Sequence, residues 1–343
     1  MDFHLTEAQR ALKETARGIA ESELEPRAAE VDRTEEYPFD NVEKLVGAGF
    51  MGMTVPIEYG GGGRPLLDAT LVVEELAAAC ATTGRIVVEG NAGAVGAIGA
   101  YGTDAQKDRW LPLVPRGEKP CIGITEAQAG SAATELTTRA ARADGHYVLN
   151  GAKCFITGAG VSHLYLVFAR MNEEPGARGI GGLVVEKGTP GFTFGRRTPM
   201  MGVRGIPEGE LVFKDCPVPE ANVLVPADGH GFRRLMTAYN GQRVGASAVA
   251  LGLAEGSFRR ASRYVRERRQ FGQAIASFQG VQWMLADMNL ELEAARLLVY
   301  RAAANAGHGF PDMHEAALAK VFAAEMAVRV TNNALQLHGA YGY

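Results

Sequence analysis

Residues 266–273 read RERRQFGQ, and they close a long periodic segment near the end of the chain. Apolar residues recur with helical spacing over Phe232–Arg269, and again over Phe278–Asn305 and Asp312–Leu337. Long periodic segments joined by short connections are typical of helices that pack side by side. They predict an antiparallel helical bundle over residues 229–343.

The middle of the chain has a different pattern, which begins at about Pro120. Short β-prone runs alternate there with turn residues, and Asp144-Gly145 between two runs is a strong signal for a two-residue hairpin. We expect strands at Leu136–Ala143, His146–Asn150, Cys154–Thr157, Leu164–Ala169 and Gly182–Glu186. The pattern predicts a small β domain over residues 119–228.

The first part of the chain, residues 1–118, is predicted to be helical. Thr6 and Gln9 fit a capping box, so a helix is expected to begin there and to end at about Leu24, before Pro26. Further helical spacing covers Leu66–Ala79 and Asn91–Leu111, and the glycine run 60–63 is expected to be a loop. Helices, then strands, then helices, without βαβ alternation, argue against a doubly wound nucleotide-binding fold.

The composition fits an ordinary globular protein. Of 343 residues, 47% are hydrophobic and 22% charged, which allows two or three domains. A net charge of -4 argues against a nucleic-acid partner. The cysteines have no paired spacing, the histidines have no metal-ligand spacing, and no segment has a leader-like or membrane-spanning pattern. We expect a cytoplasmic enzyme without a metal, whose scattered thiols are Cys80, Cys121, Cys154 and Cys216.

Three short motifs carry a family resemblance: residues 122–131 (IGITEAQAGS), 155–157 (FIT) and 268–271 (RRQF). Together they resemble the acyl-CoA dehydrogenase superfamily over essentially the whole chain. The resemblance implies an α+β multidomain fold: an N-terminal helical domain, a middle β-barrel domain and a C-terminal antiparallel helical bundle. It also implies FAD as cofactor, an acyl-CoA substrate and a homotetramer whose flavin sites are shared between subunits.

The resemblance assigns the first two motifs to the flavin and the thioester. An isoalloxazine ring needs apolar faces and a few fixed donors, and these residues offer both. Thr125 is implied to hydrogen-bond the pyrimidine edge and Thr157 flavin N5, although Thr125 alone could be a strand-end cap. Ser131 is expected near the thioester arm. The apolar faces are expected from Ile122, Ile124, Phe155 and Ile156.

The third motif is implied to reach the FAD pyrophosphate of a neighbouring subunit. Arg268 suits this role because a guanidinium pairs bidentately with phosphate oxygens. The alternative is a solvated helix end, where a cation offsets the macrodipole. The remaining residues that the resemblance assigns to the cofactor, including the adenosine half, are Gln270, Phe271, Gln336, Gly339 and Ala340.

The superfamily mechanism needs a carboxylate to remove the α-proton while a hydride leaves the β-carbon. In most members this glutamate is expected beyond Tyr343, in a C-terminal segment that this chain is expected to lack. A minority carry it where this chain has Gln242, and glutamine is not a base near neutral pH. Arg243 is expected at the mouth of the site, and Glu126 is a backup acid that more often supports its loop.

Residues 79–86, 201–208 and 238–246 resemble a subgroup of the superfamily, the 3-sulfinopropionyl-CoA desulfinases, which release sulfite and propionyl-CoA. The resemblance implies that Arg85 holds the sulfinate and that Gln242 lines the pocket, and we take these two as catalytic candidates. A cation there would be costly beside an alkyl chain but becomes a clamp for an anion. Alternatively, Arg85 points to solvent, if Gly84 marks a helix end. Tyr239 could face the pocket or pack within the bundle.

Two other functions stay open. One is a conventional short-chain acyl-CoA dehydrogenase that passes electrons to an electron-transfer flavoprotein. The other is a non-catalytic protein that binds flavin or CoA. Turnover of a thioester would distinguish the desulfinase and the dehydrogenase from the non-catalytic protein. Sulfite release would distinguish the desulfinase from the dehydrogenase.

Overall fold

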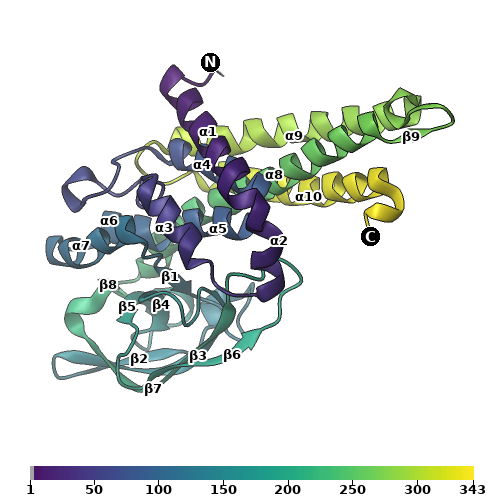
Figure 1. Cartoon of the computed structure of the whole chain (residues 1–343). Coiled ribbons are helices and arrows are strands. Elements are labelled where there is room, and N and C mark those ends of the chain that lie inside the picture. Colours follow the sequence, from purple (N-terminus) through teal and green to yellow (C-terminus); the bar gives the residue numbers. More distant parts are fainter. Residues whose placement is uncertain (1–3) are drawn as a thin grey trace.

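The computed structural model describes residues 4–343, so three residues of the predicted N-terminal domain lie outside it. Its helices and strands form three groups, with the N-terminal helices between the sheet and the last three long helices (Figure 1). The N-terminal helices are α1 (Glu7–Ile19), α2 (Glu25–Thr34), α3 (Phe39–Gly47), α4 (Leu66–Ala79), α5 (Ala81–Glu89), α6 (Ala94–Tyr101) and α7 (Asp104–Trp110).

The capping box at the start of α1 is confirmed: the Thr6 hydroxyl accepts from Gln9 N, and the Gln9 side chain accepts from Thr6 N. The predicted end before Pro26 is wrong. A π-helical turn, Ala20–Leu24, carries the chain directly into α2. Pro26 lies in the first turn of α2, where a missing backbone N–H breaks no helical hydrogen bond.

The helical segment expected over Asn91–Leu111 is divided in two. α6 ends at Tyr101 and α7 begins at Asp104, with Gly102 between them in an extended conformation. The Thr103 hydroxyl accepts from Gln106 N and caps α7, so a new helix begins here instead of the old one continuing. The helix predicted over Leu66–Ala79 is confirmed as α4.

The middle domain is one eight-stranded sheet, in the order β6-β7-β3-β2-β4-β5-β8, with β1 parallel to β4. The Asp144-Gly145 hairpin is confirmed, because Ala143 pairs with His146. The two strands expected on either side of Gly151 are one strand, β3, with irregularities in its pairing to β7. The strands are β1 (Cys121–Gly123), β2 (Arg139–Ala143), β3 (His146–Thr157), β4 (Leu164–Arg170), β5 (Ile180–Glu186), β6 (Phe192–Thr198), β7 (Glu208–Pro219) and β8 (Val223–Val225).

The sheet curves around a core of its own. Tyr165 on β4 lies 5.1 Å from Phe192 on β6, and Phe192 stacks on Phe213 of β7 at 4.9 Å between ring centroids. Since β4 and β6 are three strands apart in the sheet order, only a rolled sheet brings their side chains together. The expected barrel domain therefore exists as a rolled sheet, in which β6 and β8 end the strand order.

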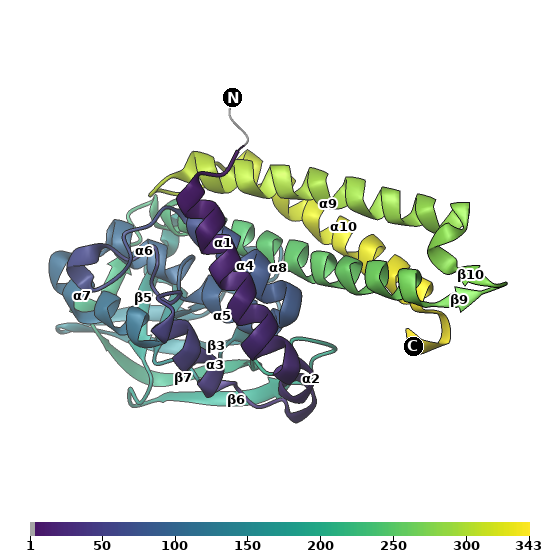
Figure 2. The same ribbon diagram turned by 45° about the horizontal axis from the view of Figure 1, so that its top comes forward.

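The last three helices form the predicted antiparallel bundle. They are α8 (Gly231–Glu267), α9 (Gln279–Ala306) and α10 (Met313–His338), and the small strands β9 (Arg269–Gln270) and β10 (Gln273–Ala274) join α8 to α9. The bundle extends beyond the N-terminal helices, with β9 and β10 at its far tip (Figure 2). α8 packs on α4, α5 and the sheet. No helix among residues 4–343 is long and apolar enough to cross a bilayer.

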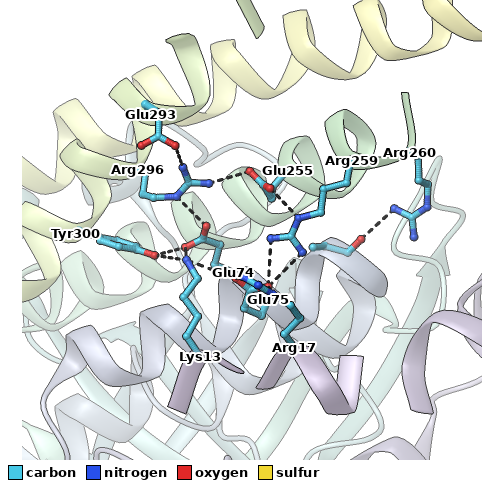
Figure 3. Close-up of polar contacts among 11 residues, drawn as sticks. Lys13, Arg17, Glu74, Glu75, Glu255, Arg259, Arg260, Glu293, Arg296 and Tyr300 are labelled. Atoms are coloured by element: carbon cyan, nitrogen blue, oxygen red, sulfur yellow. Dashed lines mark hydrogen bonds and ion pairs between the residues drawn. The ribbon is translucent and has the colours of Figure 1, made fainter. Parts of the chain in front are cut away.

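A buried ion-pair network ties the N-terminal helices to the bundle (Figure 3). Glu75 on α4 is fully buried and pairs with Lys13, Arg17 and Arg259. The neighbouring Glu74 pairs with Lys13 and Arg296 and accepts from the Tyr300 hydroxyl. Four helices, α1, α4, α8 and α9, meet at these two carboxylates.

Glu75 is expected to make the stability of the protein depend on acid pH. Burial opposes its ionisation, but the hydrogen bond from Arg17 and the charges of Lys13 and Arg259 outweigh burial and lower its pKa from 4.5 to about 2. A lowered folded-state pKa stabilises the fold above pH 4.5, by about 3 kcal/mol, and this contribution is lost as the pH falls towards 2. Urea unfolding of Glu75→Gln should show reduced stability at pH 7 and a flatter dependence between pH 5 and 3.

Glu14→Gln is the matched control, because Glu14 lies on the exposed face of α1. Its curve should follow that of the parent protein within about 0.5 kcal/mol. A Glu75→Gln protein with the parent's stability and the parent's acid dependence would contradict the assignment.

Candidate functional site

A cavity of about 310 Å³ lies where the sheet meets α5 and α8. Its walls come from the segment that follows β1, the end of β3, the middle of α5 and the first third of α8. The cavity brings together eleven of the residues predicted from the sequence: Arg85, Ile122, Ile124, Thr125, Ser131, Phe155, Ile156, Thr157, Tyr239, Gln242 and Arg243. Residues that lie far apart in the chain thus share one site.

Phe155 stands at the rim of this cavity in an unusual conformation. Its φ is +57°, a left-handed value that is costly for an aromatic residue, and 62% of the residue is exposed. The pairing of β3 with β7 is irregular between Lys153 and Ile156, which turns Phe155 out of the strand's alternation. An exposed ring held in a strained backbone is a common feature of ligand-binding positions.

Thr157 follows on the same strand, and its hydroxyl already has a partner. Thr157 Oγ1 donates to Glu208 Oε1 at the start of β7. Burial raises the pKa of Glu208, although the hydrogen bond from Thr157 and the charge of Arg85 oppose this rise. With its proton directed to Glu208, the Thr157 oxygen is left as an acceptor towards the cavity.

Arg85 lies in the cavity wall, and its partner was not identified from the sequence. Gly84 is inside α5 and not at its end, and the Arg85 side chain is 22% exposed. Arg85 Nη2 lies 2.8 Å from Glu89 Oε1, one helical turn later. Glu89 is buried and also lines the cavity. The spacing of four residues on one helix face was the signal that could have revealed it.

Gln242, on α8, meets the same carboxylate. Its Nε2 donates to Glu89 Oε1 at 2.8 Å, while its own Oε1 is buried without a hydrogen-bond partner. A Cβ atom on Gly93 would lie 2.6 Å from this oxygen, so the glycine admits the Gln242 amide. An unpaired buried acceptor beside a cavity is costly unless a ligand or water donates to it.

Arg243 and Tyr239 lie together at the cavity wall on α8. The Arg243 guanidinium lies 5.2 Å from the Tyr239 ring centroid and donates to Asn240 Oδ1. Of the two sequence interpretations of Tyr239, the structure places it in the lining and not in the interior of the bundle. A second cation thus lines the cavity with Arg85.

Glu126, the backup acid, is buried and is not part of the lining. Its carboxylate accepts from Lys153 Nζ at 2.8 Å and from the backbone N–H groups of Thr137 and Thr138. Burial opposes ionisation, but these hydrogen bonds outweigh it and lower the Glu126 pKa to about 2. A carboxylate with so low a pKa is a poor proton carrier, so Glu126 supports its loop and is not an acid of the cavity.

The residues predicted for the far half of the cofactor lie elsewhere. The strand-like loop after α8 and the end of α10 meet at the bundle tip, where Tyr264 stacks on His338 at 4.6 Å. From Arg243 to Arg268 the chain runs about 37 Å along α8. The six residues are exposed and do not line the cavity: Arg268, Gln270, Phe271, Gln336, Gly339 and Ala340. Phe271 is 93% exposed.

Residues 4–343 hold no group of three or more histidine, cysteine or acidic side chains that could bind a metal ion. The polar groups of the cavity are hydroxyls, an amide, two guanidinium groups and the Glu89 carboxylate, which already pairs with Arg85 and Gln242, and they face apolar side chains. This set suits a planar ring with polar edges and an anionic group, and it does not suit a cation.

Three family models match the chain in sequence: the acyl-CoA dehydrogenase N-terminal domain over residues 6–118, the middle domain over residues 121–216 and the C-terminal domain over residues 229–343. A 3-sulfinopropanoyl-CoA desulfinase of Variovorax paradoxus is 53% identical over 99% of this chain and 87% of its own length.

Two solved structures show the same similarity in three dimensions. Butyryl-CoA dehydrogenase of Megasphaera elsdenii is 38% identical, with a TM-score of 0.96 over 100% of this chain and 91% of its own. A glutaryl-CoA dehydrogenase of Mycobacterium smegmatis in complex with FADH2 is 26% identical, with a TM-score of 0.91 over 98% of this chain and 86% of its own.

Proposed function

The chain belongs to the acyl-CoA dehydrogenase family, and on that premise we propose that it is an FAD-dependent enzyme that removes the sulfinate group of 3-sulfinopropionyl-CoA. Water is the co-reactant: its hydrogen replaces sulfur on the carbon and its hydroxyl joins the sulfur, so the products are propionyl-CoA and sulfite. The observation that carries the proposal is the guanidinium of Arg85 in the cavity wall. The 53% identity to a desulfinase supports the same choice.

Arg85 gives the cavity a preference for an acyl chain that ends in an anion. An alkyl chain would place apolar carbon against a partly buried cation, which costs free energy. A sulfinate has two oxygens that can accept from a guanidinium in a charge-assisted pair. Arg85 would therefore hold the far end of the acyl chain and fix the position of the carbon–sulfur bond.

The carboxylate among the described lining residues is not free to remove an α-proton. Glu89 is the carboxylate among them, and Arg85 and Gln242 both occupy its Oε1. Gln242 takes the place where a minority of the family carries its base, and an amide does not accept a proton near neutral pH. The role of Gln242 would be to present its amide to the substrate or to a bound water.

The cavity residues fit the flavin of FAD. Ile122, Ile124 and Phe155 offer apolar surfaces, and the hydroxyls of Thr125 and Thr157 offer polar contacts for the ring edge. When bound, FAD supplies a planar redox-active ring beside the thioester. Ile156 would complete the apolar wall, and Ser131 and Tyr239 would line the path of the thioester arm.

The bundle-tip residues would hold the pyrophosphate and adenosine of FAD on a neighbouring subunit, since they are about 37 Å along α8 from this chain's own cavity. Sites of that kind require a homo-oligomer, and we propose a homotetramer. The four free cysteines support a cytoplasmic location, because such thiols persist in a reducing compartment.

The test is an assay of the FAD-loaded protein with 3-sulfinopropionyl-CoA and, separately, with butyryl-CoA. Sulfite release and reduction of an electron-accepting dye are followed together. We expect sulfite from the first substrate without dye reduction. Dye reduction with butyryl-CoA and no sulfite would instead identify a conventional dehydrogenase that passes electrons to an electron-transfer flavoprotein. Flavin binding without turnover of either thioester would identify a non-catalytic binding protein.

A further inference from the structure

One buried carboxylate oxygen holds both candidate catalytic residues. Arg85 Nη2 and Gln242 Nε2 each lie 2.8 Å from Glu89 Oε1, although the two residues come from different helices, α5 and α8. The Glu89 side chain is only 4% exposed. Burial of a carboxylate is costly unless it is paired, and here the pairing consists of these two contacts.

The Arg85 guanidinium is only partly used by Glu89. A guanidinium has five N–H donors, and within the described chain the one close ion pair of Arg85 is with Glu89. The edge that is turned away from Glu89 can still donate to two oxygens of an anion. Glu89 therefore orients the Arg85 guanidinium and leaves the N–H donors of its other edge for an anion.

We infer that Glu89 is a positioning and specificity-determining residue, the resident counter-ion of Arg85, which sets how strongly the cavity prefers an acyl chain that ends in an anion. The inference rests on the proposed function, because it concerns the anion clamp of that site. It assigns Glu89 no proton transfer and no covalent step.

Charge balance explains why such a counter-ion is useful. Before substrate binds, and after the sulfinate has left, Arg85 has no bound anion, and Glu89 keeps it compensated. While an anionic chain is bound, Glu89 repels it and offsets part of the attraction to Arg85. Glu208 also acts on this region through its charge interactions with Arg85 and Glu89. Glu89 would thus reduce the affinity for the anionic chain and ease release of the anionic product, sulfite.

Replacement of Glu89 by glutamine tests the effect of its negative charge separately from the effect of its contacts. The glutamine oxygen can accept from Arg85 and from Gln242, so the positions are kept while the negative charge is removed. We expect the variant to bind anionic chains more tightly, by about tenfold, because the repulsion between the Glu89 carboxylate and the bound anion is removed. A substitution that only loosened the cavity would weaken binding, so the direction of the change distinguishes the two roles.

The measurement is calorimetric titration of the FAD-loaded protein with succinyl-CoA and with butyryl-CoA. These acyl chains match in length and differ at the end, a carboxylate against a methyl group. The dissociation constant of butyryl-CoA divided by that of succinyl-CoA should exceed one in the parent protein. This ratio should be about tenfold larger in Glu89→Gln. Glu186→Gln is the matched control, because it removes the carboxylate from an arginine pair outside the cavity, Arg109–Glu186, and it should leave the ratio unchanged.

The outcomes separate this inference from the proposed function. If the parent protein binds succinyl-CoA no better than butyryl-CoA, the proposal that Arg85 clamps an anion is wrong. The parent protein could prefer succinyl-CoA while Glu89→Gln shows the same preference or a weaker one. That result would contradict the role of Glu89 but not the role of Arg85 as the anion clamp. If Glu89→Gln does not bind FAD, the same ratio of dissociation constants is measured for Gln242→Leu. With one partner removed, Glu89 pairs with Arg85 alone, so the ratio should fall, and an unchanged ratio would overturn the inference.

Discussion

Replacement of Arg85 by glutamine is expected to lower kcat/KM for 3-sulfinopropionyl-CoA by about a thousandfold. Glutamine removes the cation of the acyl pocket and leaves both the sulfinate and Glu89 buried without their shared partner. Loss of one member of a buried, hydrogen-bonded charge pair costs about 2 to 5 kcal/mol, and about 4 kcal/mol corresponds to a thousandfold. Steady-state sulfite release by the FAD-loaded variant measures the effect.

Two comparisons identify the cause of the loss. Arg85→Lys keeps a cation but not the planar fork, so its kcat/KM should fall between those of the parent and the glutamine variant. Binding of butyryl-CoA, which presents no anion to Arg85, should change by less than about threefold in Arg85→Gln. Sulfite release by Arg85→Gln at the parent's rate would show that the guanidinium does not hold the sulfinate.

Replacement of Glu126 by glutamine is expected to destabilise the protein by about 3 to 5 kcal/mol. The change leaves Lys153, which is fully buried, without its charged partner. It also turns an amide NH2 towards one of the two backbone donors, that of Thr137 or that of Thr138, because these two donors bind different oxygens of Glu126. Equilibrium unfolding in urea at pH 7 measures the loss, and FAD content measures the effect on the adjacent flavin residues.

Glu135→Gln serves as the control, because Glu135 lies in the same loop region and is exposed. Its stability should stay within about 0.5 kcal/mol of the parent's. The double change Glu126→Leu with Lys153→Met should recover part of the loss, since it removes both buried charges but leaves two backbone donors unpaired. A Glu126→Gln protein as stable as the parent would contradict the structural role of this pair.

Local sequence patterns predicted the structure correctly where a structural element depends only on residues nearby in the chain. The Thr6 capping box, the Asp144-Gly145 hairpin and the periodic segments of the bundle all form as predicted. The error at Pro26 has a local reason as well, because proline is compatible with a first helical turn and a π-helical turn supplies the connection. The strained backbone of Phe155 had no signal in the residue itself.

The sequence by itself named eleven of the residues that line the cavity, but it missed Glu89. Arg85, Thr157 and Gln242 were named from short motifs, because a motif records the chemical groups that a ligand needs. Only the tertiary structure decided how these groups are paired. Glu89, which pairs with Arg85, also accepts from Gln242, 153 positions away in the chain. Glu126 pairs with Lys153 and does not line the cavity. The energy of a buried charge depends on what surrounds it in space, and distance along the chain does not report that environment.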